Sequence, residues 1–169
     1  MATIFATNEV KNSNVKNINE NKIKNFDKAL NNVLLNLAKR VVSDGEGASK
    51  FISVKVSKCK NEMDAKKIAF SIANSPLVKT AVAGEDPNWG RVVMGIGKST
   101  EKIDKDKISI KFGDFIVAEN GSENPDCDKE KLLEYMKWDS ILIEINLNQG
   151  SDIFECYTCD FTHDYIDIN

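Results

Sequence analysis

The spacing of apolar residues predicts a long amphipathic helix that starts at Phe26. From there to Val41, apolar side chains recur at steps of three and four residues, which places them on one face of a helix. Gly45 and Gly47, in the run SDGEG, supply the residues that end it. The apolar stripe consists of Phe26, Leu30, Val33, Leu34, Leu37, Ala38 and Val41.

After this helix the pattern alternates and then returns to helical spacing. Residues 50–57, KFISVKVS, alternate apolar and polar positions, which predicts a strand with one buried face. Residues 64–74, DAKKIAFSIAN, have helical spacing again, and Pro76 fixes the exit of that helix. Residues 77–84, LVKTAVAG, predict a buried strand. The expected inward-facing residues are Ile52, Val54 and Val56 on the strand and Ala65, Ile68, Ala69 and Ile72 on the helix.

The run GEDPNWGRVVMGIG, residues 84–97, predicts a further helix. Asp86 is expected to cap its amino end, with Pro87 at the first helical position. Glycines in the run would let the helix backbone pack closely against something flat, such as a sheet or another subunit. These glycines are Gly90, Gly95 and Gly97.

The last third of the chain is rich in predicted strands. Two short strands are expected around Gly113, followed by a helix over 128–137 with Leu132, Leu133 and Met136 inside. The segments SILIEINLNQG and SDIFECYTCDFTHDYIDIN predict a closing hairpin with Gly150 in its turn. Helices and strands that alternate early, with strands dominating late, indicate a mixed α/β fold.

The first 25 residues differ in character from the rest of the chain. Residues 3–7, TIFAT, predict a short strand, whereas the Asn/Lys-rich residues 11–25 offer no continuous apolar face and predict an exposed loop. At 169 residues, the chain suits one domain or one long piece of a larger assembly.

Composition and charge exclude several classes of function. The net charge is -3, with both signs mixed along the chain, so no basic stripe suggests nucleic-acid binding. No apolar run is long enough to cross a bilayer. The four cysteines form no regular framework, which favours reduced thiols and a cytoplasmic location.

Few residue patterns suggest catalytic chemistry by themselves. His163 is the one histidine in the sequence and is interpreted as an ordinary strand residue, so a Ser–His–Asp triad is not expected. GIGKST lacks the upstream spacing of a phosphate loop, and Cys156 and Cys159 would lie on opposite faces of a strand. No metal or nucleotide cofactor is therefore expected. Glu46, between two glycines, could project a carboxylate toward an ammonium group or be a solvated turn residue.

Three segments, SDGEGASKF, IANSPLVKTAVAGEDPNWGRVVMGIG and CDFTHDYIDIN, resemble the bifunctional ornithine acetyltransferase / N-acetylglutamate synthase family of arginine biosynthesis in sequence, order and spacing. The resemblance runs from about Thr3 to the last residue. It implies a layered sandwich of facing β-sheets flanked by helices. It also implies a precursor that cleaves itself into an α and a β chain, which assemble as an α2β2 heterotetramer.

The family implies a covalent mechanism. The new N-terminal threonine of the β chain takes the acetyl group from N2-acetylornithine and passes it to glutamate, with its α-amine as the nearby base. Donors from the α chain stabilise the oxyanion. Acetyl-CoA is a co-substrate in the bifunctional members.

Only two substrate-binding residues carry over from the family to this sequence. Glu46 matches the glutamate that receives the ornithine ammonium, and Asn169 matches an asparagine of the family's C-terminal tail. The autocleavage threonine is expected upstream of Met1, so residues 1–169 correspond to a partial β chain, inactive alone and prone to self-association. No catalytic role carries over to the motif residues Asp86, Asn88, Trp89 and Arg91. A capped helix with an indole packed under it explains them; the alternative places Arg91 or Asn88 near the substrate or at a subunit contact. The alternative function is a non-catalytic amino-acid-binding or assembly module on the same scaffold.

Overall fold

The structure, a computed structural model, describes residues 21–168. The strand predicted at 3–7 and the loop predicted at 11–20 lie outside these residues. The chain divides into two compact units, residues 1–41 and residues 42–169.

Helix α1, Asn21–Ser43, begins five residues earlier than the sequence pattern predicted. Residues 21–25 therefore belong to the helix and not to the loop expected over 11–25. Ile23 explains the difference, because it continues the helical spacing of Phe26 and Leu30 by one further turn. The apolar stripe of α1 is largely exposed, with Val41 74% accessible.

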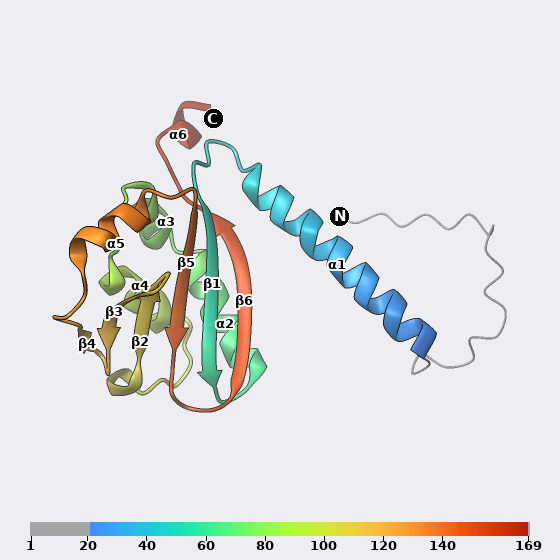
Figure 1. The fold of residues 1–169 in the computed structure, drawn as a ribbon, viewed down its shortest axis with the longest axis horizontal. Helices are drawn as coiled ribbons and strands as arrows, with labels where there is room; N and C mark the ends of the chain where they lie inside the picture. Colours follow the sequence, from blue (N-terminus) through green and yellow to red (C-terminus); the bar gives the residue numbers. More distant parts are fainter. Residues whose placement is uncertain (1–20, 169) are drawn as a thin grey trace. The chain divides into compact units, whose positions relative to one another are not determined.

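The second unit is built on one six-stranded sheet of order β4-β3-β2-β5-β1-β6 (Figure 1). Strands β1 and β5 run parallel, and the other neighbouring pairs are antiparallel. The second, facing sheet of the expected sandwich is not among the described residues. The strands are β1 Phe51–Cys59, β2 Ser109–Phe112, β3 Phe115–Glu119, β4 Ser122–Glu123, β5 Ser140–Asn146 and β6 Asp152–Cys159.

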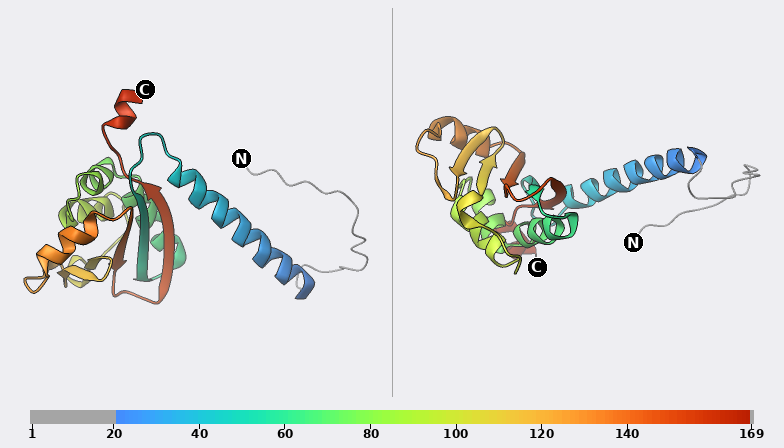
Figure 2. Two further views of the ribbon diagram at one scale, coloured as in Figure 1. Left: turned by 45° about the horizontal axis from the view of Figure 1, so that its top comes forward. Right: turned by 90° about the horizontal axis from the view of Figure 1, so that it is seen from below.

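Helices cover the sheet, and the expected mixed α/β class is confirmed. Helix α2 packs against β1 and β6 and also contacts α3 and α4, and all three helices lie behind the sheet in Figure 1, with further views in Figure 2. None of the described helices combines the length and apolar character needed to cross a membrane. The helices are α2 Glu62–Ala73, α3 Pro76–Ala83, α4 Trp89–Gly97, α5 Lys129–Met136 and α6 Asp164–Ile168, with a 3-10 turn at Lys105–Lys107.

The core forms where the predicted stripes of β1 and α2 meet. Ile52, Val54 and Val56 of β1 are fully buried, and the predicted inner residues of α2 are buried opposite them. The two short strands around Gly113 are also confirmed, as β2 and β3. In α5, Leu132 and Met136 are buried, but Leu133 is 49% exposed, so its predicted inward position is wrong.

The strand predicted over residues 77–84 is wrong, because this segment forms helix α3. Val78, Ala81 and Val82 are its buried residues, and their spacing of three and four fits a helix rather than a strand. Pro76 stands in the first turn of α3, where its missing N–H leaves no hydrogen bond unmade.

Helix α4 begins two residues later than predicted, and Asn88 caps it instead of Asp86. The Asn88 side-chain oxygen accepts a hydrogen bond from the backbone N–H of Arg91 at 3.0 Å, and Asn88 Nδ2 donates to Asp86. Of the three glycines, Gly95 makes a close approach, but to helix α2 rather than to a sheet or another subunit: a Cβ there would lie 3.2 Å from Ile72 of α2.

Strands β5 and β6 do not form the predicted hairpin, because β1 lies between them. Strand β1 pairs in parallel with β5 and antiparallel with β6, so both of its edges are hydrogen-bonded. Gly150 lies in the connection, where a Cβ would clash with the carbonyl of Cys59 at the end of β1. After Cys159 the chain leaves the sheet and forms α6, so His163 is not a strand residue.

Candidate functional site

The turn that carries Glu46 is fixed by the last segment of the chain. We call residues 44–50 the Glu46 turn and residues 160–168 the tail segment. The carboxylate of Asp160, 2% exposed, accepts hydrogen bonds from the backbone N–H groups of Ser49 and Lys50 and from the Ser49 hydroxyl. The hydroxyl of Thr162 donates to the carbonyl of Gly47 at 2.5 Å. Two elements more than 100 residues apart in sequence are therefore joined at one place.

Gly45 and Gly47, on either side of Glu46, each leave no room for a larger side chain, but for different structural reasons. A Cβ at Gly45 would lie 2.9 Å from the Sγ atom of Cys159. Gly47 has a φ of +66°, and a Cβ there would lie 2.5 Å from the backbone nitrogen of Tyr165 in α6. Glycine at 47 thus permits both the left-handed backbone of the turn and the close approach of the tail segment.

Alanine at position 47 is expected to destabilise the protein by about 1–2 kcal/mol from the left-handed backbone alone, with displacement of α6 adding to this cost. Gly97 is the matched control, because it ends α4 and a Cβ there would meet nothing within 4 Å. Gly97→Ala is expected to stabilise the protein by about 0.5–1 kcal/mol. Urea denaturation measures the free energy of unfolding of each variant. Equal changes in this free energy for Gly47→Ala and Gly97→Ala would contradict the explanation of Gly47.

A buried lysine connects the Glu46 turn to the GEDPNWGR motif. Lys50 is 8% exposed, and its ammonium donates to the carbonyl of Trp138 at 3.2 Å and lies 3.6 Å from a carboxylate oxygen of Glu85. Glu85 itself has a positive φ of 57°. The three sequence segments that carry the family resemblance thus meet at Lys50 and Asp160.

Of the two predicted substrate-binding residues, the structure describes one. Glu46 is exposed at the tip of the turn, whereas Asn169 lies outside the described residues. The tail segment that leads to Asn169 contacts Gly47 through Asp164 and Tyr165. The pairing of Glu46 with Asn169 therefore stays a prediction.

A pocket of about 330 Å³ lies between α3 and the tail segment. Thr162, which bonds the Glu46 turn, is one of its lining residues, so this pocket adjoins the turn. The lining is mainly apolar, with the side chains of Thr80, Thr162 and His163 as its polar groups, and such a lining is typical of small-molecule pockets. The lining residues are Thr80, Ala83, Gly84, Phe161, Thr162, His163 and Ile166.

The polar residues of the GEDPNWGR motif have structural partners. Arg91 donates to the carbonyl of Leu77 at 2.9 Å and to the Thr80 hydroxyl at 3.2 Å, which links α4 to α3. Asn88 caps α4, as described above. These contacts favour the structural explanation of the motif over a catalytic one.

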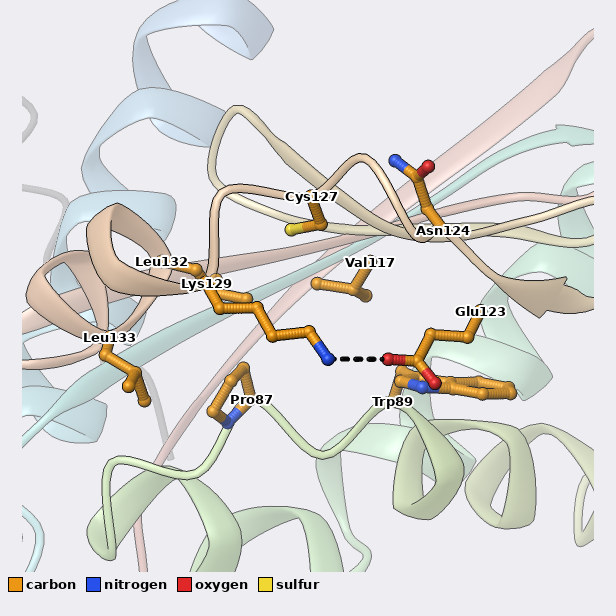
Figure 3. Close-up of a pocket in the computed structure, with 9 residues that line it drawn as sticks. All are labelled: Pro87, Trp89, Val117, Glu123, Asn124, Cys127, Lys129, Leu132 and Leu133. Atoms are coloured by element: carbon orange, nitrogen blue, oxygen red, sulfur yellow. Dashed lines mark hydrogen bonds and ion pairs between the residues drawn. The ribbon is translucent and has the colours of Figure 1, made fainter.

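Trp89 of the same motif lines a second, mainly apolar pocket of about 220 Å³ (Figure 3). Lys129 reaches across this pocket to Glu123, with 3.0 Å between the ammonium and carboxylate atoms. The lining residues are Pro87, Trp89, Val117, Glu123, Asn124, Cys127, Lys129, Leu132 and Leu133.

The cysteines of the CxxC run lie on opposite faces of β6, as predicted. Cys156 pairs with Val54 on the buried face, and Cys159 pairs with Phe51. Burial raises the pKa of the Cys156 thiol to about 11, which disfavours the thiolate needed for metal binding or redox chemistry. Among residues 21–168, no three metal-ligating side chains form a cluster that could hold an ion.

Sequence reasoning missed Asp160 and Lys50. Each is a charged residue directly adjacent to a strand end, next to Cys159 and Phe51 respectively. A charge at the end of a buried strand needs hydrogen-bond partners, and this signal could have identified both. The identity of those partners depends on the pairing of β1 with β6.

The whole chain, residues 1–169, matches the ArgJ family. It is 52% identical over 144 residues to the arginine biosynthesis bifunctional protein ArgJ of Ruegeria pomeroyi, covering 85% of this chain and 35% of the relative. The same protein of Gluconobacter oxydans is 45% identical over 169 residues, covering 100% and 40%. The chain thus spans well under half the length of these relatives.

The fold agrees with the sequence comparison. The crystal structure of the arginine biosynthesis bifunctional protein argJ from Bacillus halodurans matches with a TM-score of 0.84 and 35% identity, covering 88% of this chain and 70% of that chain. The family indicated by the three motif segments is confirmed. The chain belongs to the ArgJ family.

Proposed function

We propose that this chain forms part of an acetyltransferase of arginine biosynthesis that moves the acetyl group of N2-acetylornithine to glutamate. Acetyl-CoA would serve as a further acetyl donor if the parent enzyme is bifunctional, and no other cofactor is involved. The main support is the convergence of the family's three motif segments on one turn, whose exposed tip is Glu46. The proposed location is the cytoplasm.

In this proposal the chain contributes to substrate binding and supplies no nucleophile. The Glu46 carboxylate receives the ornithine ammonium, since a charge-assisted hydrogen bond is stronger than a neutral one. Asn169 holds the substrate from the tail. This role is compatible with the approach of the tail segment to Gly47.

The nucleophile is proposed to be the N-terminal threonine released by autocatalytic cleavage of the precursor, in a segment preceding residue 1. Its hydroxyl attacks the acetyl carbonyl of N2-acetylornithine, ornithine leaves with a proton delivered by the threonine amine, and an acetyl-threonine ester remains. The amine of glutamate then attacks this ester and restores the hydroxyl. The α chain supplies the oxyanion donors, and the assembly is α2β2.

A chimeric enzyme tests this function. The 144 residues of the Ruegeria pomeroyi relative that match this chain are replaced by the residues of this chain, and acetyl transfer from N2-acetylornithine to glutamate is followed by mass spectrometry. The chimera is expected to turn over at a rate comparable to the unmodified relative, which is the positive control. The 169-residue chain alone is expected to give no turnover.

Two outcomes would contradict the proposal in different ways. A folded, correctly assembled chimera without activity would favour the non-catalytic amino-acid-binding or assembly module. Turnover by the 169-residue chain alone would show that the nucleophile lies within residues 1–169.

A further inference from the structure

Asp160 holds the Glu46 turn through both of its carboxylate oxygens. Oδ1 accepts the backbone N–H groups of Ser49 at 2.8 Å and Lys50 at 3.0 Å, and Oδ2 accepts the Ser49 hydroxyl at 2.5 Å. The residue is 2% exposed, so water has little access to replace these bonds. A buried donor that loses its acceptor is costly: the bond from the Lys50 N–H is buried, and the two bonds from Ser49 are part-buried, so three donors depend on this one side chain.

The same residue also ties the turn to the sheet. The backbone N–H of Asp160 donates to the carbonyl of Lys50 at 3.1 Å, which extends the β1–β6 pairing one residue beyond the Phe51–Cys159 pair. Lys50 is thus bonded to both the side chain and the backbone of Asp160, and Ser49 to the side chain. Glu46 lies three residues before Ser49, and the Thr162–Gly47 bond fixes the residue that directly follows Glu46.

We propose that Asp160 is a positioning residue that sets the place of the Glu46 carboxylate for the ammonium group of ornithine. This inference rests on the proposed function of Glu46. Asp160 acts through the Glu46 turn and does not itself touch the substrate. Turns are mobile unless tied to a scaffold, and a carboxylate must be held in place if it is to recognise an ammonium group.

The bonding pattern predicts which substitution rescues the role. Asparagine keeps the Oδ1 oxygen that accepts both backbone N–H groups, and its amide nitrogen can donate to the Ser49 hydroxyl once that hydroxyl rotates. Alanine leaves all three donors without this acceptor. Asp160→Asn is therefore expected to preserve the position of the turn, and Asp160→Ala to lose it.

The test uses the 169-residue chain and two measurements by nuclear magnetic resonance. Amide hydrogen exchange reports whether the N–H groups of Ser49 and Lys50 are held, and a titration with ornithine gives its dissociation constant. Asp160→Ala is expected to raise the exchange rates of both amides about tenfold and the dissociation constant of ornithine about tenfold. A tenfold change corresponds to about 1.4 kcal/mol. Asp160→Asn is expected to remain close to the unsubstituted chain in both.

A destabilised control separates positioning from general loss of stability. Ser71 donates a 2.7 Å hydrogen bond to the carbonyl of Gly95, between α2 and α4. Ser71→Ala is expected to lower the unfolding temperature without changing ornithine binding or the relative exchange at Ser49 and Lys50. If it weakens binding as much as Asp160→Ala, the positioning role is overturned.

Failure of the inference and failure of the proposed function give different results. If the unsubstituted chain binds ornithine, Glu46→Gln abolishes binding and Asp160→Ala does not change it, the inference is overturned and the function stands. If Asp160→Asn is as damaging as Asp160→Ala, the negative charge matters rather than the position, and the inference is also overturned. If the unsubstituted chain does not bind ornithine, or Glu46→Gln binds it equally well, the proposed role of Glu46 fails and the positioning role fails with it.

Discussion

Replacing Glu46 by glutamine in the chimeric enzyme is expected to lower kcat/KM for N2-acetylornithine about 10- to 150-fold. A hydrogen bond to a charged group contributes about 1.5–3 kcal/mol, and each 1.36 kcal/mol corresponds to a tenfold change in rate. Glutamine has nearly the shape of glutamate and leaves both flanking glycines unchanged, so the loss reports on the charge. Steady-state kinetics over a range of N2-acetylornithine concentrations measure it.

The matched control is Glu119→Gln. Glu119 is an exposed glutamate at the end of β3, and the substitution removes the same charge far along the sheet from the Glu46 turn. The kcat/KM of the Glu119→Gln chimera for N2-acetylornithine is expected to equal that of the unsubstituted chimera. Equal losses in the two variants would show a general effect of net charge, and an unchanged Glu46→Gln variant would remove Glu46 from the substrate site.

Replacing Ile143 by alanine is expected to destabilise the 169-residue chain by about 2–5 kcal/mol, as for other buried aliphatic residues cut back to alanine. Ile143 is fully buried in β5, with Val54 of β1 on one side and Phe112 of β2 on the other in the strand register. Because both neighbouring strands are fixed by backbone hydrogen bonds, the cavity cannot readily collapse. A loss of this size is a large part of the stability of a typical domain, about 5–15 kcal/mol.

Urea denaturation at constant temperature measures the free energy of unfolding. Ile153→Ala is the control, because Ile153 is 51% exposed on the edge strand β6 and undergoes the same chemical change. It is expected to cost only about 0.5 kcal/mol, as surface substitutions do. If the two variants differ by less than about 1 kcal/mol, Ile143 does not lie in a rigid core.

The elements whose patterns were regular over many residues were predicted correctly. The alternation in residues 50–57 and the helical stripe of residues 64–74 each fit one periodicity, so local sequence was enough to assign β1 and α2. Residues 77–84 are short and apolar, and both periodicities fit such a run. Contacts of α3 with α4 and α2 decided the outcome there.

The order of strands could not be read from local signals. Gly150 and its flanking strands have the sequence features of a hairpin, but a hairpin would pair β5 with β6 directly. Instead β1 lies between them, and both of its edges are paired. That arrangement depends on contacts between residues about 90 positions apart in the chain, as in the pairing of Val54 with Ile143.

Short motifs and periodic patterns were enough to establish the family, the class of the fold and the glycine-flanked turn of Glu46. The contacts of Asp160 and Lys50 that hold this turn in place emerged from the folded chain. Their partners are remote in sequence: Asp160 accepts hydrogen bonds from residues 110 or more positions earlier, and Lys50 forms an ion pair with Glu85 of the GEDPNWGR motif, so both sets of contacts exist only in the folded chain, where β1 is paired with β6.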